Sequence, residues 1–392
     1  MKSIDDNVDL NQKKIILRLD LNVPLTNGNI TDTTRIDKII PTINFLLKNN
    51  SKIIIISHVG RPKGKILNEL SLKPICDDIK KKINTNIKLV TKNINEIKAS
   101  DLFNNPNEKV LMLENIRFYK EEEENDTNFA KLISNLGDIY VNEAFSCSHR
   151  THSSIHKIPK FLPSYSGLQL NTEINALKKL TSKIERPITC IIGGSKISTK
   201  IDIIKNLICK FDNIVIVGGM ANNILEYKGL QIGNSLKEEN CKKIVEEIFS
   251  ISEKQKCKII YPQDVLVGKN LEDVSKIKLS TDIKKDDMIL DIGPETIKII
   301  KNIIKISNTV FWNGPAGYFE NSNFAHGSYE IAKEIAENTK NGKIYSVIGG
   351  GDTVSVIKKI NLFNSYNFVS TAGGAFLEYL EGKDLPGISA LN

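Results

Sequence analysis

The chain has 392 residues, 40% of them hydrophobic and 26% charged, which is ordinary for a globular protein and long enough for two or three domains. Its net charge is +8, but lysine and glutamate interleave and form no basic block, so anionic small substrates explain the excess as well as nucleic acid does. No apolar run approaches the roughly 20 residues of a membrane span, and the polar, acidic start is unlike a signal peptide, so we expect a cytoplasmic protein.

The six cysteines are scattered and include no CxxC pair. This spacing argues against a structural zinc site and indicates reduced thiols. Cys147 lies near two histidines in the sequence, but nothing in the pattern supplies it with a base. We therefore expect a buried, inert thiol rather than a nucleophile.

In the first part of the chain, short β-branched runs recur that are apolar almost throughout. They occupy residues 13–19, 52–57, 87–90, 109–113 and 138–142. Such runs are typical of strands buried on both faces of a parallel sheet. Between the first two, an apolar stripe from Ile36 to Leu47 predicts an amphipathic helix, capped near residues 31–34, which Pro41 should kink or begin. The acidic run at 121–124 is typical of a solvated helix face.

Residues 168–183 predict one amphipathic helix that bridges this series to a second one. The second series of strand-like runs occupies residues 188–192, 213–217, 258–262, 309–311, 344–348 and 367–370. Strand and helix patterns alternate in both series, which indicates parallel sheets covered by helices on both faces. The sequence therefore predicts an α/β protein with two doubly wound, Rossmann-like domains.

Ligands of open parallel sheets bind beyond the carboxyl ends of the strands. In the first series these ends, and the helix start that follows, carry cationic and hydrogen-bonding side chains: Asp20, Asn22, Arg35, His58, Arg61, Glu114, Arg117, Asn142, Glu143, His149 and Arg150. Only six of the 54 basic residues are arginine, and five of the six precede residue 151. Because the arginine guanidinium group can form bidentate hydrogen bonds with carboxylates and phosphates, this half suits a small, strongly anionic substrate.

In the second series the strand ends are rich in glycine: Gly193-Gly194, Gly218-Gly219, Asn313-Gly314-Pro315, Gly349-Gly350-Gly351 and Gly373-Gly374. Glycine lets backbone N–H groups and helix N-termini approach phosphates closely. Lys196 and Lys200 are four residues apart and are predicted to share one face of the helix that begins there. Asp352 opens a helix and is suited to hold a magnesium ion against phosphates. This half predicts a nucleotide site.

None of these motifs is specific alone. A glycine pair is common in turns, the two lysines are compatible with a solvated face, Asp352 with a plain helix cap and His58 with a structural role. Neither GxGxxG nor GxxxxGK[ST] is present, which argues against a nicotinamide-dependent dehydrogenase and an ordinary P-loop kinase. The non-enzyme alternative is a nucleic-acid-binding module, although only 6% of the residues are aromatic. Salt-sensitive retention on DNA would favour the module, and saturable ADP or ATP binding would favour an enzyme.

Ordered motifs over nearly the whole chain resemble the phosphoglycerate kinase family. The motifs are RLDLNVPL (18–25), TDTTRIDKIIPTI (31–43), SHVGRPKG (57–64), LENIRFYKEEEEND (113–126), YVNEAFSCSHRTHSS (140–154), GGSKISTKI (193–201), IVGGM (216–220), LDIGPET (290–296), FWNGPAGYFE (311–320), IGGGDT (348–353) and STAGGAFLEYLEGKDLPG (370–387). The resemblance implies reversible phosphoryl transfer between 1,3-bisphosphoglycerate and ADP in glycolysis, giving 3-phosphoglycerate and ATP, with Mg²⁺ as cofactor. It implies no nucleic-acid or membrane partner, and we expect a monomer.

The resemblance also implies a domain organisation. We expect a phosphoglycerate-binding domain over 1–167, the bridging helix over 168–183, a nucleotide-binding domain over 184–371 and a C-terminal segment, 372–392, that returns to the first domain. The two lobes would close about the bridging helix to expel water from the reaction.

Site residues follow from the same resemblance. The phosphoglycerate site would consist of Asp20, Asn22, Arg35, His58, Arg61, Arg117 and Arg150. The nucleotide site would consist of Gly193, Gly194, Lys196, Lys200, Gly218, Gly219, Asn313, Pro315, Glu320, Gly350, Gly351, Asp352 and Thr353, with Glu320 on the ribose and Asp352 on the metal. The residues expected to act on the transferring phosphoryl group are Arg35, Lys196, Lys200 and the amides near Gly351 and Gly373.

Three residues depart from the family pattern. Ala372 stands in place of the first glycine of a triple-glycine motif, Ser146 in place of a glycine and Glu143 in place of an aspartate. Since Gly373 and Gly374 remain, activity is still expected.

Overall fold

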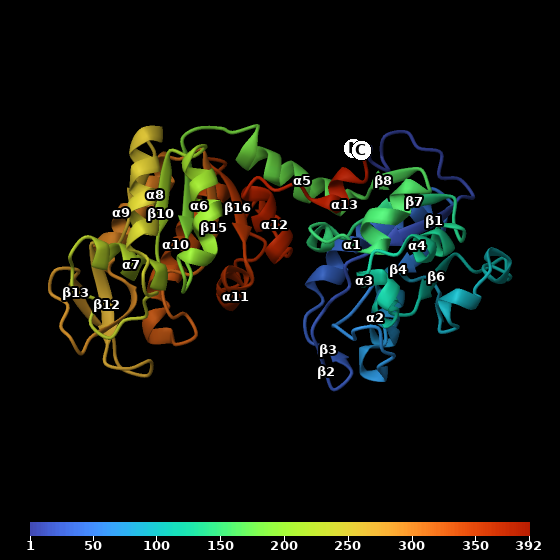
Figure 1. Ribbon diagram of the computed structural model, residues 1–392, viewed down its shortest axis with the longest axis horizontal. Coiled ribbons are helices and arrows are strands. Elements are labelled where there is room, and N and C mark those ends of the chain that lie inside the picture. The colour runs from blue at the N-terminus through green and yellow to red at the C-terminus, as the bar shows by residue number, and fades with distance from the viewer. The chain divides into compact units, whose positions relative to one another are not determined.

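The computed structural model describes the whole chain, residues 1–392. The chain forms two compact units: Met1–Asn175 together with Asp384–Asn392, here called unit 1, and Ala176–Lys383, here called unit 2. Both chain ends belong to unit 1 (Figure 1). None of the helices is both long enough and apolar enough to span a bilayer.

Unit 1 is built on a six-stranded sheet with the order β5-β6-β4-β1-β7-β8, in which every pair of neighbours is parallel. The strands are β1 (Lys14–Arg18), β4 (Lys52–Ile56), β5 (Ile87–Val90), β6 (Val110–Leu113), β7 (Ile139–Asn142) and β8 (Ser164–Ser166). The four residues Ile53–Ile56 of β4 are fully buried, which explains an unbroken apolar run in place of alternation. The five predicted strands are confirmed, and β8 adds an edge strand that was not predicted.

The helices of unit 1 are α1 (Thr34–Lys48), α2 (Lys73–Ile83), α3 (Lys120–Glu123), α4 (Thr127–Ser134) and α13 (Pro386–Ser389), and a short hairpin pairs β2 (Leu25–Thr26) with β3 (Asn29–Ile30). Helix α1 confirms the predicted apolar stripe, because Ile36, Ile39 and Ile43 are buried along one face. The helix continues through Pro41 and begins seven residues before it.

Unit 2 is built on a second parallel sheet, with the order β11-β10-β9-β15-β16-β17. Its strands are β9 (Ile188–Ile192), β10 (Asn213–Ile216), β11 (Lys258–Ile260), β15 (Thr309–Asn313), β16 (Tyr345–Gly349) and β17 (Phe368–Val369). The chain moves outward from β9 to β11 and then resumes on the other side of β9 with β15. The reversal of strand order therefore lies between β9 and β15, where doubly wound sheets bind ligands.

The helices of unit 2 are α6 (Ile201–Ile208), α7 (Gly219–Tyr227), α8 (Lys242–Gln255), α9 (Pro294–Ile306), α10 (His326–Lys340), α11 (Gly351–Lys359) and α12 (Gly373–Leu380). A three-stranded antiparallel sheet joins β13 (Lys276–Leu279), β12 (Asp264–Gly268) and β14 (Met288–Ile292), and the sequence analysis missed it. In Figure 1, β12 and β13 lie apart from the strands of the large sheet. Lysines alternate in β13 with Ile277 and Leu279, which are 65% and 55% exposed, so the pattern contains no buried face to recognise.

Helix α5 (Leu168–Thr181) fits the helix predicted over 168–183, and the unit boundary falls inside it, after Asn175. The segment that rejoins unit 1 begins at Asp384, whereas the sequence boundary was drawn at residue 372. The reason is α12, which packs on α6 of unit 2 and whose Leu380 carbonyl accepts a hydrogen bond from Asn206.

Candidate active site

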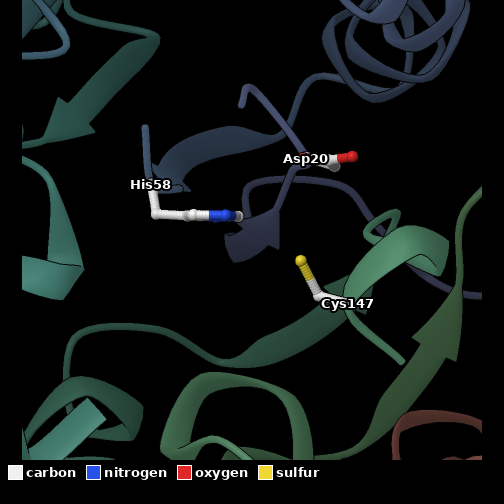
Figure 2. Close-up of side chains that lie close together, drawn as sticks. All are labelled: Asp20, His58 and Cys147. Carbon is white, nitrogen blue, oxygen red and sulfur yellow. The ribbon is translucent and has the colours of Figure 1, made fainter. Parts of the chain in front are cut away.

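At the carboxyl edge of the unit 1 sheet, three side chains from separate loops meet. Asp20 follows β1, His58 follows β4 and Cys147 lies in the loop after β7. Figure 2 shows the three side chains gathered around one space, and their polar atoms lie within 4.8 Å of one another. Because β4, β1 and β7 are neighbours in the sheet, the predicted strand ends converge as parallel topology requires.

Arg35 in the first turn of α1 joins this cluster. Its Nη1 atom lies 2.8 Å from Asp20 Oδ2 and donates to the carbonyl of Asn22 at 3.1 Å. The side-chain oxygen of Asn22 accepts from Gly60 N at 2.9 Å, which ties this loop to the one that carries Arg61. The Arg35 side chain is 28% exposed, so a ligand can reach the guanidinium group that Asp20 orients.

His58 is buried and neutral. Burial, together with the positive charges of Arg18 and Arg117, holds the pKa of its imidazole well below the usual value. The Nδ1 atom lies 3.2 Å from Arg18 Nη2, and since a guanidinium can only donate, Nδ1 accepts and Nε2 carries the proton. His58 thus offers one N–H donor, which suits an anionic oxygen.

Arg18 and Glu122 lie behind His58, and both are fully buried. Arg18 Nε donates to Ser154 Oγ at 2.8 Å, and Glu122 accepts from Ser154 N at 2.9 Å and from Ser154 Oγ at 2.6 Å. The interpretation of residues 121–124 as a solvated face is wrong for Glu122, because the first turn of a short helix directs it inward. Arg18 was absent from the predicted site, although an arginine that ends an apolar strand run was the available signal.

Arg117 is the second buried arginine of this pocket. It is 5% exposed and its Nη1 donates to the carbonyl of Gly60 at 3.1 Å. Its Nε makes no hydrogen bond but lies 3.5 Å from Glu123 Oε1. A buried guanidinium nitrogen that makes no hydrogen bond can still donate to the oxygen of an anionic ligand. Arg61 and Arg150 are exposed, and neither side chain makes a hydrogen bond or an ion pair.

The cluster of Asp20, His58 and Cys147 has the ligand types of a metal site, yet its chemistry suits an anion better. Nδ1 of His58 is already engaged with Arg18, and its other nitrogen bears the proton. Burial and the charge of Asp20 raise the pKa of the Cys147 thiol, so the thiolate that a metal requires is disfavoured. Arg18, Arg35 and Arg117 add positive charge around the same space. The expectation of an inert thiol at Cys147 agrees with this environment.

Unit 2 contains a cavity of about 550 Å³, a volume typical of small-molecule sites. Six of the predicted nucleotide residues line it: Gly194, Gly218, Gly219, Pro315, Glu320 and Asp352. One wall is apolar and comes largely from residues that the sequence analysis missed, among them Leu236, Val265, Leu271, Met288 and Leu290. Most of these belong to the antiparallel sheet or its loops, so they could not be found while that sheet was unrecognised.

Two glycines bring the strand ends of β9 and β15 into close backbone contact. A Cβ atom at Gly193 would overlap the carbonyl oxygen of Pro315, and one at Gly314 would overlap Gly193. Gly314 also has a φ of +106°, which favours glycine. The two glycines therefore let the ends of β9 and β15 meet where the strand order reverses, next to Gly194 and Pro315, which line the cavity.

The two predicted phosphate-binding lysines do not share a helix face, so that prediction is wrong. Lys196 is exposed in the loop after β9, and Lys200 ends a 3₁₀ turn, Ser198–Lys200, before α6 begins. Gly194 has a φ of +151°, which is not helical, so the helix cannot begin directly after β9. It begins only at Ile201, and Lys196 therefore lies outside it.

Lys200 turns inward toward the strand ends. Its Nζ donates to the carbonyl of Gly193 at 2.6 Å and to Asn313 Oδ1 at 2.7 Å. Burial lowers the pKa of Lys200 to about 8. The other side-chain atom of Asn313, Nδ2, is buried without a hydrogen-bond partner and is available to a ligand oxygen.

Helix N-termini supply the remaining predicted positions. Gly350 precedes α11, Gly351 and Asp352 open it, and the hydroxyl of Thr353 accepts from Gly314 N at 2.7 Å. Gly373 opens α12, where Ala372 is buried at the N-cap. Gly351 and Gly373 have no atom within 4 Å of an added Cβ, so the space around them is open. Open N–H groups at helix starts attract phosphate oxygens.

Comparison with known proteins gives one consistent result. The family model described as phosphoglycerate kinase matches residues 4–383. The phosphoglycerate kinase of Wolbachia pipientis wMel is 44% identical over 388 residues, which cover 98% of this chain and 97% of that protein. The phosphoglycerate kinase of Orientia tsutsugamushi (strain Ikeda) is also 44% identical over 388 residues, with 98% and 96% covered. The solved structure of phosphoglycerate kinase from Coxiella burnetii has a TM-score of 0.91 and 34% identity, and covers 98% of this chain and 97% of its own.

Proposed function

Because this chain belongs to the phosphoglycerate kinase family, we propose that it transfers a phosphoryl group reversibly between 1,3-bisphosphoglycerate and ADP, giving 3-phosphoglycerate and ATP. Family membership makes it an ATP-dependent phosphotransferase of glycolysis. The observation that carries the assignment of two substrates is the contrast between two sites. Unit 1 holds a cluster of arginines, two of them buried, around Asp20 and His58, and unit 2 holds a cavity lined by glycines and aliphatic side chains.

The pocket of unit 1 is the proposed phosphoglycerate site. Arg35, Arg117 and the protonated nitrogen of His58 would bind phosphate and carboxylate oxygens, and exposed Arg61 and Arg150 would fold over the ligand. Asp20 and Asn22 would accept from the substrate hydroxyl while Asp20 keeps Arg35 in place. Support for an anion at this position comes from the buried Nε of Arg117, which makes no hydrogen bond and has only the partly exposed Glu123 carboxylate, 3.5 Å away, as an ion-pair partner.

The cavity of unit 2 is the proposed nucleotide site. The purine would lie against the apolar wall, and Glu320 would accept from the ribose hydroxyls. The N–H groups around Gly194, Gly218 and Gly219 would face the phosphates, since only glycines allow backbone to approach that closely.

The chemistry needs positioning and charge neutralisation more than a nucleophile, because the acyl phosphate already has a good leaving group. Arg35, Lys196 and Lys200 would neutralise the charge that spreads over the transferring phosphoryl group. The N–H groups near Gly351 and Gly373 would hold the same oxygens in line with the acceptor. Water must be excluded while this happens, since it competes as an acceptor.

Magnesium fits the residues of unit 2. Mg²⁺ in proteins is commonly held by one or two carboxylates together with substrate phosphates, and Asp352 presents one carboxylate beside the cavity at the start of α11. When bound, the ion would screen the negative charge of the nucleotide phosphates. Asp352 is thus the proposed ligand.

A coupled assay tests the function directly. Purified protein with 1,3-bisphosphoglycerate, ADP and magnesium should form ATP, and omission of magnesium should reduce the rate. Saturable nucleotide binding without salt-sensitive retention on DNA would separate the kinase from the nucleic-acid-binding alternative. Absence of ATP formation by folded protein would refute the proposal. A monomeric state and a cytoplasmic location stay predictions, which gel filtration with light scattering and cell fractionation would examine.

A further inference from the structure

Glu143 is a buried carboxyl group to which the proposed mechanism gives no role. It follows β7 directly, is 2% exposed, and its backbone N–H donates to the carbonyl of Arg18 at 2.8 Å. It therefore sits at the same carboxyl edge of the sheet as the phosphoglycerate pocket. The loop that starts with it contains Cys147 and Arg150, and Ser146 of that loop donates to Asp20.

The side chain of Glu143 joins three separate elements. Oε1 accepts from the hydroxyl of Thr42 on α1 and from Gln169 N at 3.1 Å, and Oε2 accepts from Leu170 N at 2.7 Å. Gln169 and Leu170 belong to the first turn of α5, where backbone N–H groups have no partner inside the helix. The carboxyl group thus ties the end of β7 to the middle of α1 and to the start of α5.

The contact with α1 connects Glu143 to the proposed catalytic arginine. Thr42 and Arg35 are seven residues apart, which is two helical turns, so they lie on the same face of α1. Holding Thr42 therefore fixes both the rotation of α1 and its advance along its axis. Arg35, at the start of that helix, reaches Asp20 at 2.8 Å as a result.

Gly167 shows how closely the carboxyl group is enclosed. A Cβ atom at Gly167 would overlap Cδ and Oε1 of Glu143. The residue before α5 is therefore matched in size to this side chain, and enlarging it would displace the carboxyl group without changing its chemistry.

We propose that Glu143 is a positioning residue for phosphoryl transfer: its carboxylate holds α1, the 143–150 loop and the first turn of α5 in one arrangement and thereby places Arg35 over the substrate pocket. The proposal rests on the proposed function. Glu143 itself does not touch the substrate; it acts through Thr42 and the α5 backbone.

The protonation of Glu143 offers a way to observe this role. Burial raises the pKa of Glu143 to about 7, while Thr42 and the amides of α5 partly oppose the shift. No cation pairs with its carboxylate: α1 presents Thr42, β1 presents Arg18, whose guanidinium is bonded to Ser154 and His58, and α5 presents Glu173, which accepts from Gln169. Only the ionised form attracts several N–H donors strongly, so the arrangement should be held best above pH 7.

The test compares Glu143→Gln, Gly167→Ala and Glu143→Asp with wild type, and uses Glu337→Gln, an exposed glutamate on α10, as the charge-matched control. At pH 8, Glu143→Gln and Gly167→Ala should each lower kcat about tenfold through a misplaced Arg35, with KM for the nucleotide nearly unchanged. The double variant should be little worse than either single one, because both changes remove the same contact. Glu143→Asp, which keeps the charge, should recover most of kcat.

Two readouts separate positioning from a merely structural role. The wild-type kcat should rise through about pH 7 with a step that Glu143→Gln lacks. Amide exchange at residues 168–170 should quicken in Glu143→Gln, and this can be measured without turnover. A Glu143→Gln enzyme with wild-type kcat and the wild-type pH profile would overturn the proposal, even if it melted at a lower temperature. If wild type itself formed no ATP, the proposed function would fail first, so the two failures are distinguishable.

Discussion

Lys200 lies in surroundings that lower the pKa of its ammonium group. Its ammonium group is largely buried and bonded to neutral carbonyl and amide oxygens, and the only nearby carboxylate that acts on it is Asp352. A lysine used to neutralise phosphate charge must nevertheless be protonated. The pKa of about 8 therefore sets an upper pH limit for the free enzyme.

The first prediction concerns this limit. For the wild-type enzyme, kcat/KM for the nucleotide should fall as pH rises through about 8, because deprotonated Lys200 no longer attracts phosphate. Lys200→Arg should lose the descending limb, since arginine stays charged. Stability should change in the opposite sense: folded Lys200 releases its proton before unfolded lysine does, so the free energy of unfolding should rise between about pH 8 and the normal lysine pKa of about 10.5. A pH profile of kcat/KM, beside denaturant melts, measures both.

A second prediction at this scale concerns Arg35. Arg35→Ala should lower kcat by roughly 10²- to 10³-fold, the usual loss when one donor to transition-state charge is removed. Nucleotide affinity should stay near wild type, because Arg35 belongs to unit 1 and the nucleotide cavity to unit 2. Steady-state kinetics and calorimetric titration with ADP measure the two quantities. Near-normal turnover by Arg35→Ala would contradict the assignment.

Among the secondary-structure elements, the strands of the two parallel sheets were predicted, except the edge strand β8, and those of the antiparallel sheet were not. Strands such as β4 and β9 are buried on both faces, so their consecutive residues are apolar and the run can be recognised in the sequence. Strand β13 is largely exposed, and nothing in its composition distinguishes it from a loop. The apolar wall of the nucleotide cavity was missed for another reason: β12 and β14, which supply most of it, are short buried apolar runs like the parallel strands and were overlooked. The helix proposed for Lys196 failed because spacing alone does not reveal a glycine-centred turn.

The sequence pattern also failed to predict the burial of some individual side chains. The run 121–124 is uniformly acidic, and only the turn that follows Tyr119 directs Glu122 inward to Ser154. By contrast, Asp20, Arg35 and His58 were found because parallel topology forces neighbouring strand ends together. Predicting where strands end therefore brought Asp20 and His58 together, but it did not reveal the buried Arg18 and Glu122.

The third prediction tests the junction between β9 and β15. Gly193→Ala should lower the free energy of unfolding by about 1–3 kcal/mol, as overpacking of a tight contact usually does, because the new methyl group would meet the Pro315 carbonyl. Nucleotide binding should weaken as well, since the neighbouring residues Gly194 and Pro315, which line the cavity, would shift. Urea melts and ADP titration measure the change. Gly349→Ala, at the end of the neighbouring strand β16, serves as the comparison, because its new methyl group would make only ordinary contacts, the nearest at 3.4 Å.

At the scale of the whole molecule, each unit has its own core and its own proposed ligand. Ligands stabilise the part to which they bind by an amount that depends on concentration over Kd, about 2.7 kcal/mol at a hundredfold excess. The two substrates should therefore stabilise different sets of backbone amides.

The fourth prediction follows from this separation. In hydrogen-exchange measurements, 3-phosphoglycerate alone should protect the loops after β1, β4 and β7, and ADP with magnesium alone should protect those after β9, β10 and β15. Glu320→Ala should abolish much of the second pattern and raise KM for the nucleotide, and KM for the acid substrate should be nearly unchanged. The reverse distribution would exchange the two assignments.

The return of the chain to unit 1 has a consequence for synthesis on the ribosome. Gly387 N donates to the carbonyl of Ser148 at 2.8 Å, and Asn142 Nδ2 donates back to Gly387 at 3.4 Å, so the loop that borders the anion pocket is completed by residues translated last. During synthesis, unit 2 can form all its native contacts before unit 1 can, although most of unit 1 is translated first. A product that terminates prematurely near residue 383 would therefore retain a nucleotide cavity but leave its 143–150 loop unsupported.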